Sequence, residues 1–321
     1  MTRPGLIHSI LGIACCATVG LCALPQTQTS PASSTGAEQV FRAQSDLVVL
    51  HVNVFDGRSD AVPGLPQSAF SIVEDGAPQE ISFFNSTDMP VAVGLVVDNS
   101  GSMIARHKLV TAGTQAFIHD SHPEDQLFAV IFNEHVRFGL PSGEAFTTNP
   151  NMVQAALSRY PAGGKTAIYD AVVAALDHLE DATHQKRVLI VLSDGEDNAS
   201  HLSAEDMYSK AKRSNAIIYT VSNAMAGRGD NSGDRKVLRN LAEYTGGLAY
   251  FPDDEAGVVA AFSAIAGNIR RGYSIGYEPS GDAHHDGAFR HVQVRVRAPG
   301  YKNLTVRTRD GYLAADHAGT R

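Results

Sequence analysis

The amino-acid sequence predicts a doubly wound α/β domain with a mainly parallel sheet, inserted in a small β-sandwich-like domain. Two patterns predict this fold class. Between residues 89 and 270, short aliphatic runs alternate with helical patterns, and several runs are almost continuously apolar, as strands buried on both faces are. On either side of this stretch, apolar and polar residues alternate, which is typical of strands with one solvated face. Strand–helix alternation favours right-handed βαβ units and therefore a parallel sheet.

The first 24 residues are predicted to form a secretory signal peptide. They carry Arg3 and then a mostly apolar stretch of small and aliphatic residues, with a cleavage position near Ala23. A short transmembrane anchor is the alternative, and a lipoprotein signal meets only one of its two sequence requirements. All three cysteines of the chain lie in this segment: Cys15, Cys16 and Cys22. Its removal would leave a mature chain without a membrane span and without thiol or disulfide chemistry.

Two short segments precede the α/β part. Residues 25–44 are rich in Ser, Thr, Pro and Gly and are predicted to be a disordered spacer. Residues 45–88 alternate apolar and polar positions between turns, which predicts N-terminal β strands over 47–56, 70–76 and 80–85. Roughly forty residues in short strands are too few to bury a core of their own.

The α/β part, residues 89–270, is predicted to alternate strands with helices. The apolar runs predict strands at 91–97, 127–132, 187–193, 216–222 and 248–251. The patterns between them predict helices at 107–119, 152–160, 167–179, 204–214, 235–244 and 257–269. A sheet of this kind is covered by helices on both faces, and its ligands bind outside the carboxyl ends of the strands.

Residues 271–315 return to a strand pattern. The runs 272–279, 291–299 and 303–313 are predicted strands, and the alternation in VQVRVR indicates one buried face and one solvated face. Neither β segment is self-sufficient, and the two flank the α/β part in the sequence. We therefore expect the C-terminal strands to pair with the N-terminal ones.

The charge of the chain argues against nucleic acid as a partner. The formal net charge is −8, and Lys and Arg form no long runs in the sequence. Nucleic-acid binding requires grouped basic side chains that replace the counterions of phosphates. We therefore expect no nucleic-acid partner.

Three polar clusters stand where the predicted strands end or a predicted helix begins. Asp98, Ser100 and Ser102 follow the run VAVGLVV, Thr166 opens a helix, and Asp194 follows RVLIVLS. These two carboxylates and three hydroxyls form an all-oxygen set, which suits a hard divalent ion such as Mg²⁺ and offers zinc no thiolate or imidazole. Because hydroxyl ligands are neutral, an ion held by few carboxylates keeps positive charge and can accept an acidic group from outside.

The motifs DNSGSM, GGKTAIYDAV and LSDGEDN resemble, in this order and spacing, the metal-ion-dependent adhesion site of von Willebrand factor type A domains. The resemblance covers residues 90–269. It implies that Ser100 and Ser102 bind the metal directly and that Asp98 and Asp194 act partly through water. It also implies that Thr166 joins the metal in the ligand-bound state. The flanking strands resemble those of a group of bacterial secreted proteins that carry this domain between β elements.

Each cluster also has a purely structural interpretation. Asp98 and Ser100 are typical helix caps, Thr166 is a typical N-cap, and Asp194 before a glycine is typical of a turn. An enzyme is the functional alternative, a hydrolase or phosphotransferase with Asp98 or Ser100 as nucleophile. A phosphotransferase of that kind would have Asp in place of Ser100. The hydrolase string G-x-S-x-G occurs at 272–276, inside a predicted strand and not before a helix.

The sequence thus predicts an interaction module and not an enzyme. We expect it to be secreted, or to lie in the periplasm or cell envelope, and to capture an Asp or Glu side chain of a protein partner through Mg²⁺ or Mn²⁺. A subunit of a larger envelope or metal-chelation machine would use the same site. The tripeptide Arg228-Gly229-Asp230 is interpreted as a chance match, and the pair His284-His285 as part of a polar hairpin loop.

Overall fold

The computed structural model describes residues 47–57, 60–222, 232–279 and 286–314, all of which lie in one compact unit, 45–321. The predicted signal peptide and spacer, the Arg-Gly-Asp tripeptide and the histidine pair lie outside the described residues. Those predictions stay predictions, as do the domain boundaries within the compact unit. No helix in the described part of the chain is long and apolar enough to cross a membrane.

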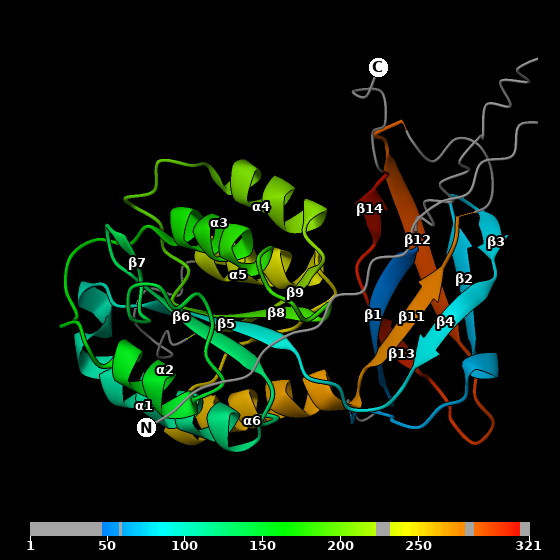
Figure 1. Cartoon of the computed structure of the whole chain (residues 1–321), viewed down its shortest axis with the longest axis horizontal. Coiled ribbons are helices and arrows are strands. Elements are labelled where there is room, and N and C mark those ends of the chain that lie inside the picture. Colours follow the sequence, from blue (N-terminus) through cyan, green and yellow to red (C-terminus); the bar gives the residue numbers. More distant parts are fainter. Residues whose placement is uncertain (1–46, 58–59, 223–231, 280–285, 315–321) are drawn as a thin grey trace, which may run out of the picture. The chain divides into compact units, whose positions relative to one another are not determined.

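A six-stranded sheet forms the centre of the α/β part, in the order β10-β9-β8-β5-β6-β7 (Figure 1). Its parallel strands are β5 (Ala92–Asp98), β6 (Gln126–Phe132), β8 (Arg187–Ser193), β9 (Ala216–Ser222) and β10 (Ala249–Tyr250). All side chains of the central strand β5 are buried, which explains why its sequence shows no alternation. The predicted parallel sheet is confirmed.

Helices cover both faces of this sheet (Figure 1). One face carries α1 (His107–His119), α2 (Pro150–Leu157) and α6 (Glu255–Arg271), and the other carries α3 (Ile168–Leu179), α4 (Ala204–Arg213) and α5 (Ser232–Glu243). Gly94 in β5 leaves room for side chains of the two neighbouring strands, because a Cβ there would lie 2.3 Å from the ring of Phe128 in β6 and 2.6 Å from Leu189 in β8. Two separate apolar cores, one on each face, hold the helices in place.

The remaining strands form two antiparallel four-stranded sheets, each built from both ends of the chain. One has the order β13-β1-β11-β4, with β1 (Val48–Phe55), β4 (Ile81–Asn85), β11 (Tyr273–Tyr277) and β13 (Thr305–Arg307). The other has the order β14-β12-β2-β3, with β2 (Phe70–Glu74), β3 (Ala77–Gln79), β12 (Phe289–Val296) and β14 (Gly311–Leu313). A shared apolar core joins the two sheets, so the predicted sandwich of N- and C-terminal strands is confirmed.

The structure differs from the sequence prediction in small elements. An antiparallel edge strand, β7 (Val136–Phe138), was not expected because its three residues lie in a polar stretch. A 3₁₀ helix, η2 (Gly101–Arg106), precedes α1, and another, η1 (Gln67–Ala69), precedes β2. Helix α2 begins two residues earlier than predicted, because Asn149 caps it by accepting a hydrogen bond from the Asn151 amide.

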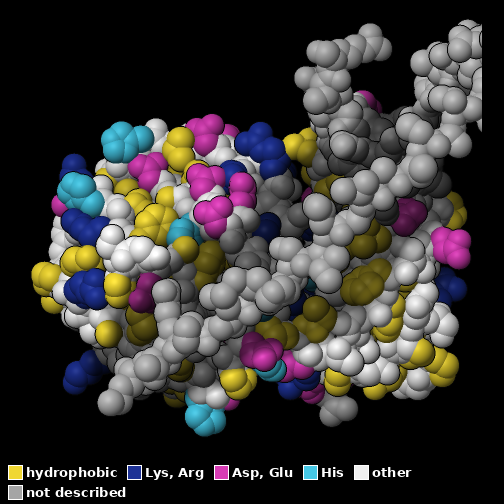
Figure 2. All heavy atoms as spheres, viewed as in Figure 1, with side chains coloured by type: hydrophobic (Ala, Val, Ile, Leu, Met, Phe, Trp, Pro, Cys, Tyr) yellow, Lys and Arg dark blue, Asp and Glu magenta, His cyan; other side chains and the backbone are white. Residues whose placement is uncertain are grey.

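Charges are mixed on the face of the molecule shown in Figure 2. Among the described side chains in view, Lys and Arg are interspersed with Asp and Glu and form no basic stripe. Electrostatic tracking of a phosphate backbone requires such a stripe. On this face, the described surface offers no footprint for nucleic acid.

Candidate metal centre

Asp98 is the last residue of β5 and is buried, with 1% of its surface exposed. Its Oδ1 accepts a hydrogen bond of 2.9 Å from the amide of Ser100, which closes a tight turn. Its Oδ2 accepts a hydrogen bond of 2.7 Å from the hydroxyl of Ser193, at the end of the neighbouring strand β8. The carboxylate is therefore held by neutral donors from two strand ends.

The environment of Asp98 opposes its negative charge. Burial raises the pKa of this carboxyl, and the nearby Asp194 carboxylate acts in the same direction. Hydrogen bonds from Ser100 and Ser193 act in the opposite direction without cancelling the effect of burial. A cation placed beside Asp98 would relieve this unfavourable burial.

The two serines of the first motif come together after Asp98. The hydroxyl oxygens of Ser100 and Ser102 lie 3.1 Å apart, with Ser100 buried and Ser102 exposed. The amide of Met103 donates to the Ser100 carbonyl at 3.0 Å, and the Met103 side chain is buried in the core. This anchor turns the chain so that one serine faces inward and the other faces solvent.

Thr166 lies in a loop that is bonded to the other two motifs. On one side, the Gly101 amide donates to the Gly164 carbonyl at 3.0 Å. On the other side, the Thr166 amide donates to Oδ1 of Asn198 at 2.9 Å, and the Asn198 amide donates back to the Thr166 carbonyl at 3.0 Å. Thr166 is buried and is not the N-cap of α3, because that position belongs to Ala167. The capping interpretation of Thr166 is therefore wrong.

The tight form of this loop depends on Gly164. Its φ is +85°, and a Cβ there would lie 1.8 Å from Oε2 of Glu134. The same carboxylate oxygen accepts a hydrogen bond of 2.9 Å from the Lys165 amide. Glycine is required so that Glu134 can hold the backbone just before Thr166.

Asp194 follows β8 and forms an ion pair. Its Oδ2 lies 3.7 Å from Nη1 of Arg106, and both side chains are largely buried, with 16% and 14% of their surfaces exposed. The next residue, Gly195, has a φ of +90°, and a Cβ there would lie 2.7 Å from the Asp234 carbonyl oxygen. Asp194 thus lies at the sheet edge next to Asp98, but shares its carboxylate with a guanidinium.

The structure brings the three predicted motifs to one edge of the sheet, through the contacts described above. The sequence prediction missed two residues of this edge, Ser193 and Arg106. Ser193 could have been found by aligning β8 with β5, since Val97 pairs with Leu192 and the next residue along each strand is therefore Asp98 or Ser193. No strand pairing or motif in the sequence pointed to Arg106. Among the described residues, no three His, Cys, Asp or Glu side chains gather as a metal site.

Residues 93–196 of the chain match the family model of the von Willebrand factor type A domain. This part of the chain is a von Willebrand factor type A domain. The matched residues include the first two motifs and the LSDGE part of the third, and so all five residues of the cluster from Asp98 to Asp194. None of the curated proteins compared with the chain matches it.

Several solved structures are similar to the type A domain and its surroundings. BatB, a conserved hypothetical protein from Bacteroides thetaiotaomicron, is 18% identical over 56% of this chain and 97% of its own, with a TM-score of 0.45. A von Willebrand factor type A protein from Catenulispora acidiphila is 16% identical over 86% of this chain and 76% of its own, with a TM-score of 0.49. The corresponding domain of the type V pili tip protein Mfa5 from Porphyromonas gingivalis is 14% identical over 57% and 96%, with a TM-score of 0.46.

Proposed function

We propose that this protein is a metal-dependent interaction module outside the cytoplasm or in the cell envelope. In this proposal Asp98, Ser100, Ser102, Thr166 and Asp194 hold Mg²⁺ or Mn²⁺. When bound, the ion supplies a positive, open coordination position for an Asp or Glu side chain of a protein partner. Two observations support the proposal: the match to the type A domain and the convergence of the three motifs at one sheet edge. The predicted signal peptide supports the location.

The donor set fits the ion. Carboxylate and hydroxyl oxygens are the ligands that Mg²⁺ and Mn²⁺ take in proteins, and the set contains no sulfur or nitrogen donor. Ser100 and Ser102, with their oxygens 3.1 Å apart, are close enough to serve one ion. Among the described residues, the hydrogen bonds to the buried Asp98 come from hydroxyl and amide donors and not from a cation, which buried carboxylates usually have as a partner.

Arg106 gives the site a resident positive charge. Its guanidinium pairs with Asp194, so a divalent ion that draws on Asp194 competes with Arg106 or shares the carboxylate with it. In this proposal, the positive charge of Arg106 adds to that of the ion and favours an acidic partner over a cationic one.

The enzyme alternative has one specific observation in its favour. Ser274, the serine of the G-x-S-x-G string, lies 3.1 Å from Nδ1 of His51 on the neighbouring strand. However, burial lowers the pKa of His51 to about 3, with the positive charges of Lys186 and Arg309 adding to the effect, so His51 is a poor general base near neutral pH. Ser274 also lies inside β11 and not on a strand–helix elbow. We therefore keep the interaction module as the proposed function.

A pair of peptides tests the proposed capture of an acidic side chain. One peptide carries a single Glu between Gly and Ala residues, and its twin carries Gln. With ¹⁵N-labelled protein in Mg²⁺, the Glu peptide should shift amide resonances of the three motif loops in a saturable way. The Gln peptide should not, and EDTA should remove the effect.

Matched variants separate the site from the rest of the surface. Asp98→Asn keeps the size of the side chain and its hydrogen-bond acceptor but removes the charge, and it should abolish peptide binding. Asp177→Asn removes a carboxylate of α3 that is 60% exposed and should leave binding unchanged. Equal binding of both peptides, or full binding by Asp98→Asn in EDTA, would show that recognition does not use this site.

A further inference from the structure

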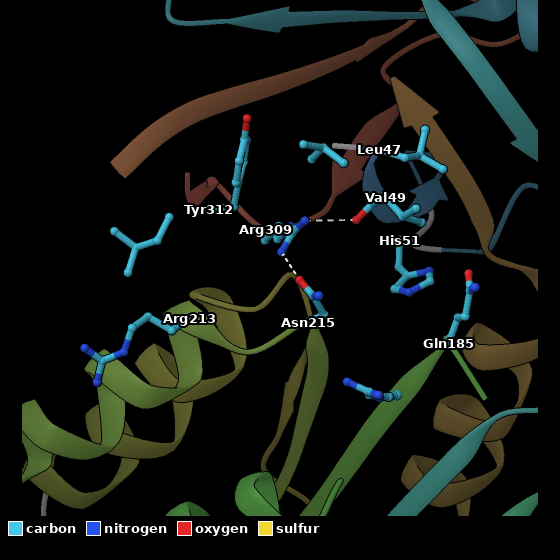
Figure 3. Close-up of a pocket in the computed structure, with 11 residues that line it drawn as sticks. Leu47, Val49, His51, Gln185, Arg213, Asn215, Arg309 and Tyr312 are labelled. Carbon is cyan, nitrogen blue, oxygen red and sulfur yellow. Dashed lines mark hydrogen bonds between the residues drawn. The ribbon is translucent and has the colours of Figure 1, made fainter. Parts of the chain in front are cut away.

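An open cavity of about 460 Å³ lies at the amino end of the parallel sheet, at the opposite end of the strands from Asp98. One side is formed by residues at the starts of β8 and β9, and the other by β1, β14 and the segment before β14 (Figure 3). Cavities of this size are typical of small-molecule sites.

The described residues that line this cavity include basic side chains and no acidic one. The basic residues are Arg187, Arg213 and Arg309, while His51 is neutral near pH 7 because burial lowers its pKa to about 3. Two carboxylates beside lining residues have other partners: Glu180 pairs with Lys210 at 2.7 Å, and Glu74 accepts hydrogen bonds from the hydroxyls of Tyr277 and Tyr312. The cavity therefore carries positive charge that no lining carboxylate neutralises.

Arg309 is held by neutral groups. Its Nη1 donates to Oδ1 of Asn215 at 2.6 Å and its Nη2 donates to the Val49 carbonyl at 3.0 Å, as the dashed lines in Figure 3 show. Its Nε is buried and has no hydrogen-bond partner. Burial lowers the pKa of this guanidinium, which shows that the site disfavours an uncompensated positive charge.

Arg187 also has neutral hydrogen-bond partners. Its Nη2 donates to the backbone carbonyls of Glu180 and Ala182 at 3.1 and 3.3 Å, and its Nε is also buried without a partner. Two guanidinium groups whose hydrogen-bond partners among the described residues are all neutral thus border one cavity. Arg213 differs, because its side chain extends away from Arg309 in Figure 3.

We propose that this cavity binds a small organic anion through a carboxylate or phosphate group, anchored by Arg187 and Arg309. The planar fork of a guanidinium matches both groups with paired hydrogen bonds, and an anion would supply the missing counter-charge. Asn215 and Gln185 border the same cavity and offer amide groups to the rest of the ligand. This site is separate from the metal cluster and does not rest on the proposed function.

Thermal unfolding and calorimetry of the full chain test this proposal. Succinate and inorganic phosphate are titrated separately at constant ionic strength, with NaCl as the reference. At least one of the two anions should raise Tm in a saturable way and give a one-site binding isotherm. The anion that binds more tightly identifies the group that the site prefers.

Three variants locate the binding. Asn215→Asp places a carboxylate on Arg309 and should weaken anion binding at least tenfold while the protein remains folded. Arg187→Gln should weaken binding without adding a charge, and Arg213→Gln is the control that should bind like the wild type. No saturable response to either anion, or unchanged affinity in both Asn215→Asp and Arg187→Gln, would overturn the proposal.

Discussion

Asp98 and Asp125 are both buried carboxylates at the edges of one parallel sheet, and their surroundings differ. Asp125 lies just before β6, at the amino edge, and accepts hydrogen bonds from the Val91 and His122 amides and from the guanidinium of Arg270. Asp98 ends β5, at the carboxyl edge, and receives only a hydroxyl and an amide, while its charged neighbour Asp194 has the same sign. Each has 1% of its surface exposed. The difference between them is the presence of a protein cation.

This comparison suggests different roles for the two carboxylates: Asp125 stabilises the fold, and Asp98 is the one that we propose binds a ligand. Arg270 belongs to the last turn of α6, so the Asp125 pair holds that helix against the starts of the strands. Among the described residues, no hydrogen bond or ion pair joins Asp98 itself to a cation, because Arg106 pairs with the neighbouring Asp194. The cavity with Arg187 and Arg309 has the opposite imbalance, because there the cations lack an anion. We therefore expect a cation to bind at the carboxyl edge and an anion to bind in this cavity.

Breaking the structural pair should have the largest effect on stability. Arg270→Ala leaves Asp125 buried without its cation, and we expect a loss of roughly 3–5 kcal/mol in the free energy of unfolding. Urea unfolding measures this loss. The neighbouring Arg271 is exposed, and Arg271→Ala should change stability by no more than about 0.5 kcal/mol. Similar values for the two variants would mean that the Asp125 pair is not structural.

At the carboxyl edge, Thr166→Ala is expected to have a smaller effect, on the affinity for an acidic ligand. If the Thr166 hydroxyl reaches the ion chiefly when an acidic ligand is bound, the variant should weaken binding of the Glu peptide severalfold and change Mg²⁺ affinity less. Thr166→Ser keeps the hydroxyl and should restore peptide binding. Calorimetric titrations of Mg²⁺ and then of peptide separate the two affinities. Equal losses in both would contradict this role of Thr166.

A pH-dependent effect on stability is expected from Lys186, which is buried at the amino edge. Burial lowers its pKa to about 8, and the charge of Arg270 adds to the effect. Because the folded state releases this proton before the unfolded state does, the stabilising contribution is complete above the ordinary value of 10.5 and is lost as pH falls through about 8. The wild type should therefore gain stability relative to Lys186→Met between these pH values. A flat difference in unfolding free energy over this range would refute the expected behaviour.

The sequence was sufficient to predict the fold class and the convergence of the motifs. Continuous apolar runs such as VAVGLVV mark strands buried on both faces, and the carboxyl ends of neighbouring parallel strands lie at one edge. The assignment of Asp98, Ser100, Ser102, Thr166 and Asp194 to a metal remains a prediction. The features that the sequence could predict were those carried by residues close together in the chain, such as strand patterns and short polar motifs.

Contacts between distant residues were not predictable in the same way. Ser193 donates to a carboxylate 95 positions earlier, and Arg309 reaches Asn215 across 94 positions. No short motif carries such pairs, because they depend on strand register and on how the β sheets contact the α/β part. The same reason applies to β7, whose three residues are strand only because β6 offers them an edge.

The response to Mg²⁺ of the wild type and Asp98→Asn tests the central claim most directly. An ion that binds only the folded state adds about 2.7 kcal/mol at a hundredfold excess over its Kd. The account predicts a saturable rise in Tm for the wild type and for the control Asp177→Asn, and none for Asp98→Asn. An equal rise in Asp98→Asn, or no rise in the wild type with either Mg²⁺ or Mn²⁺, would contradict it.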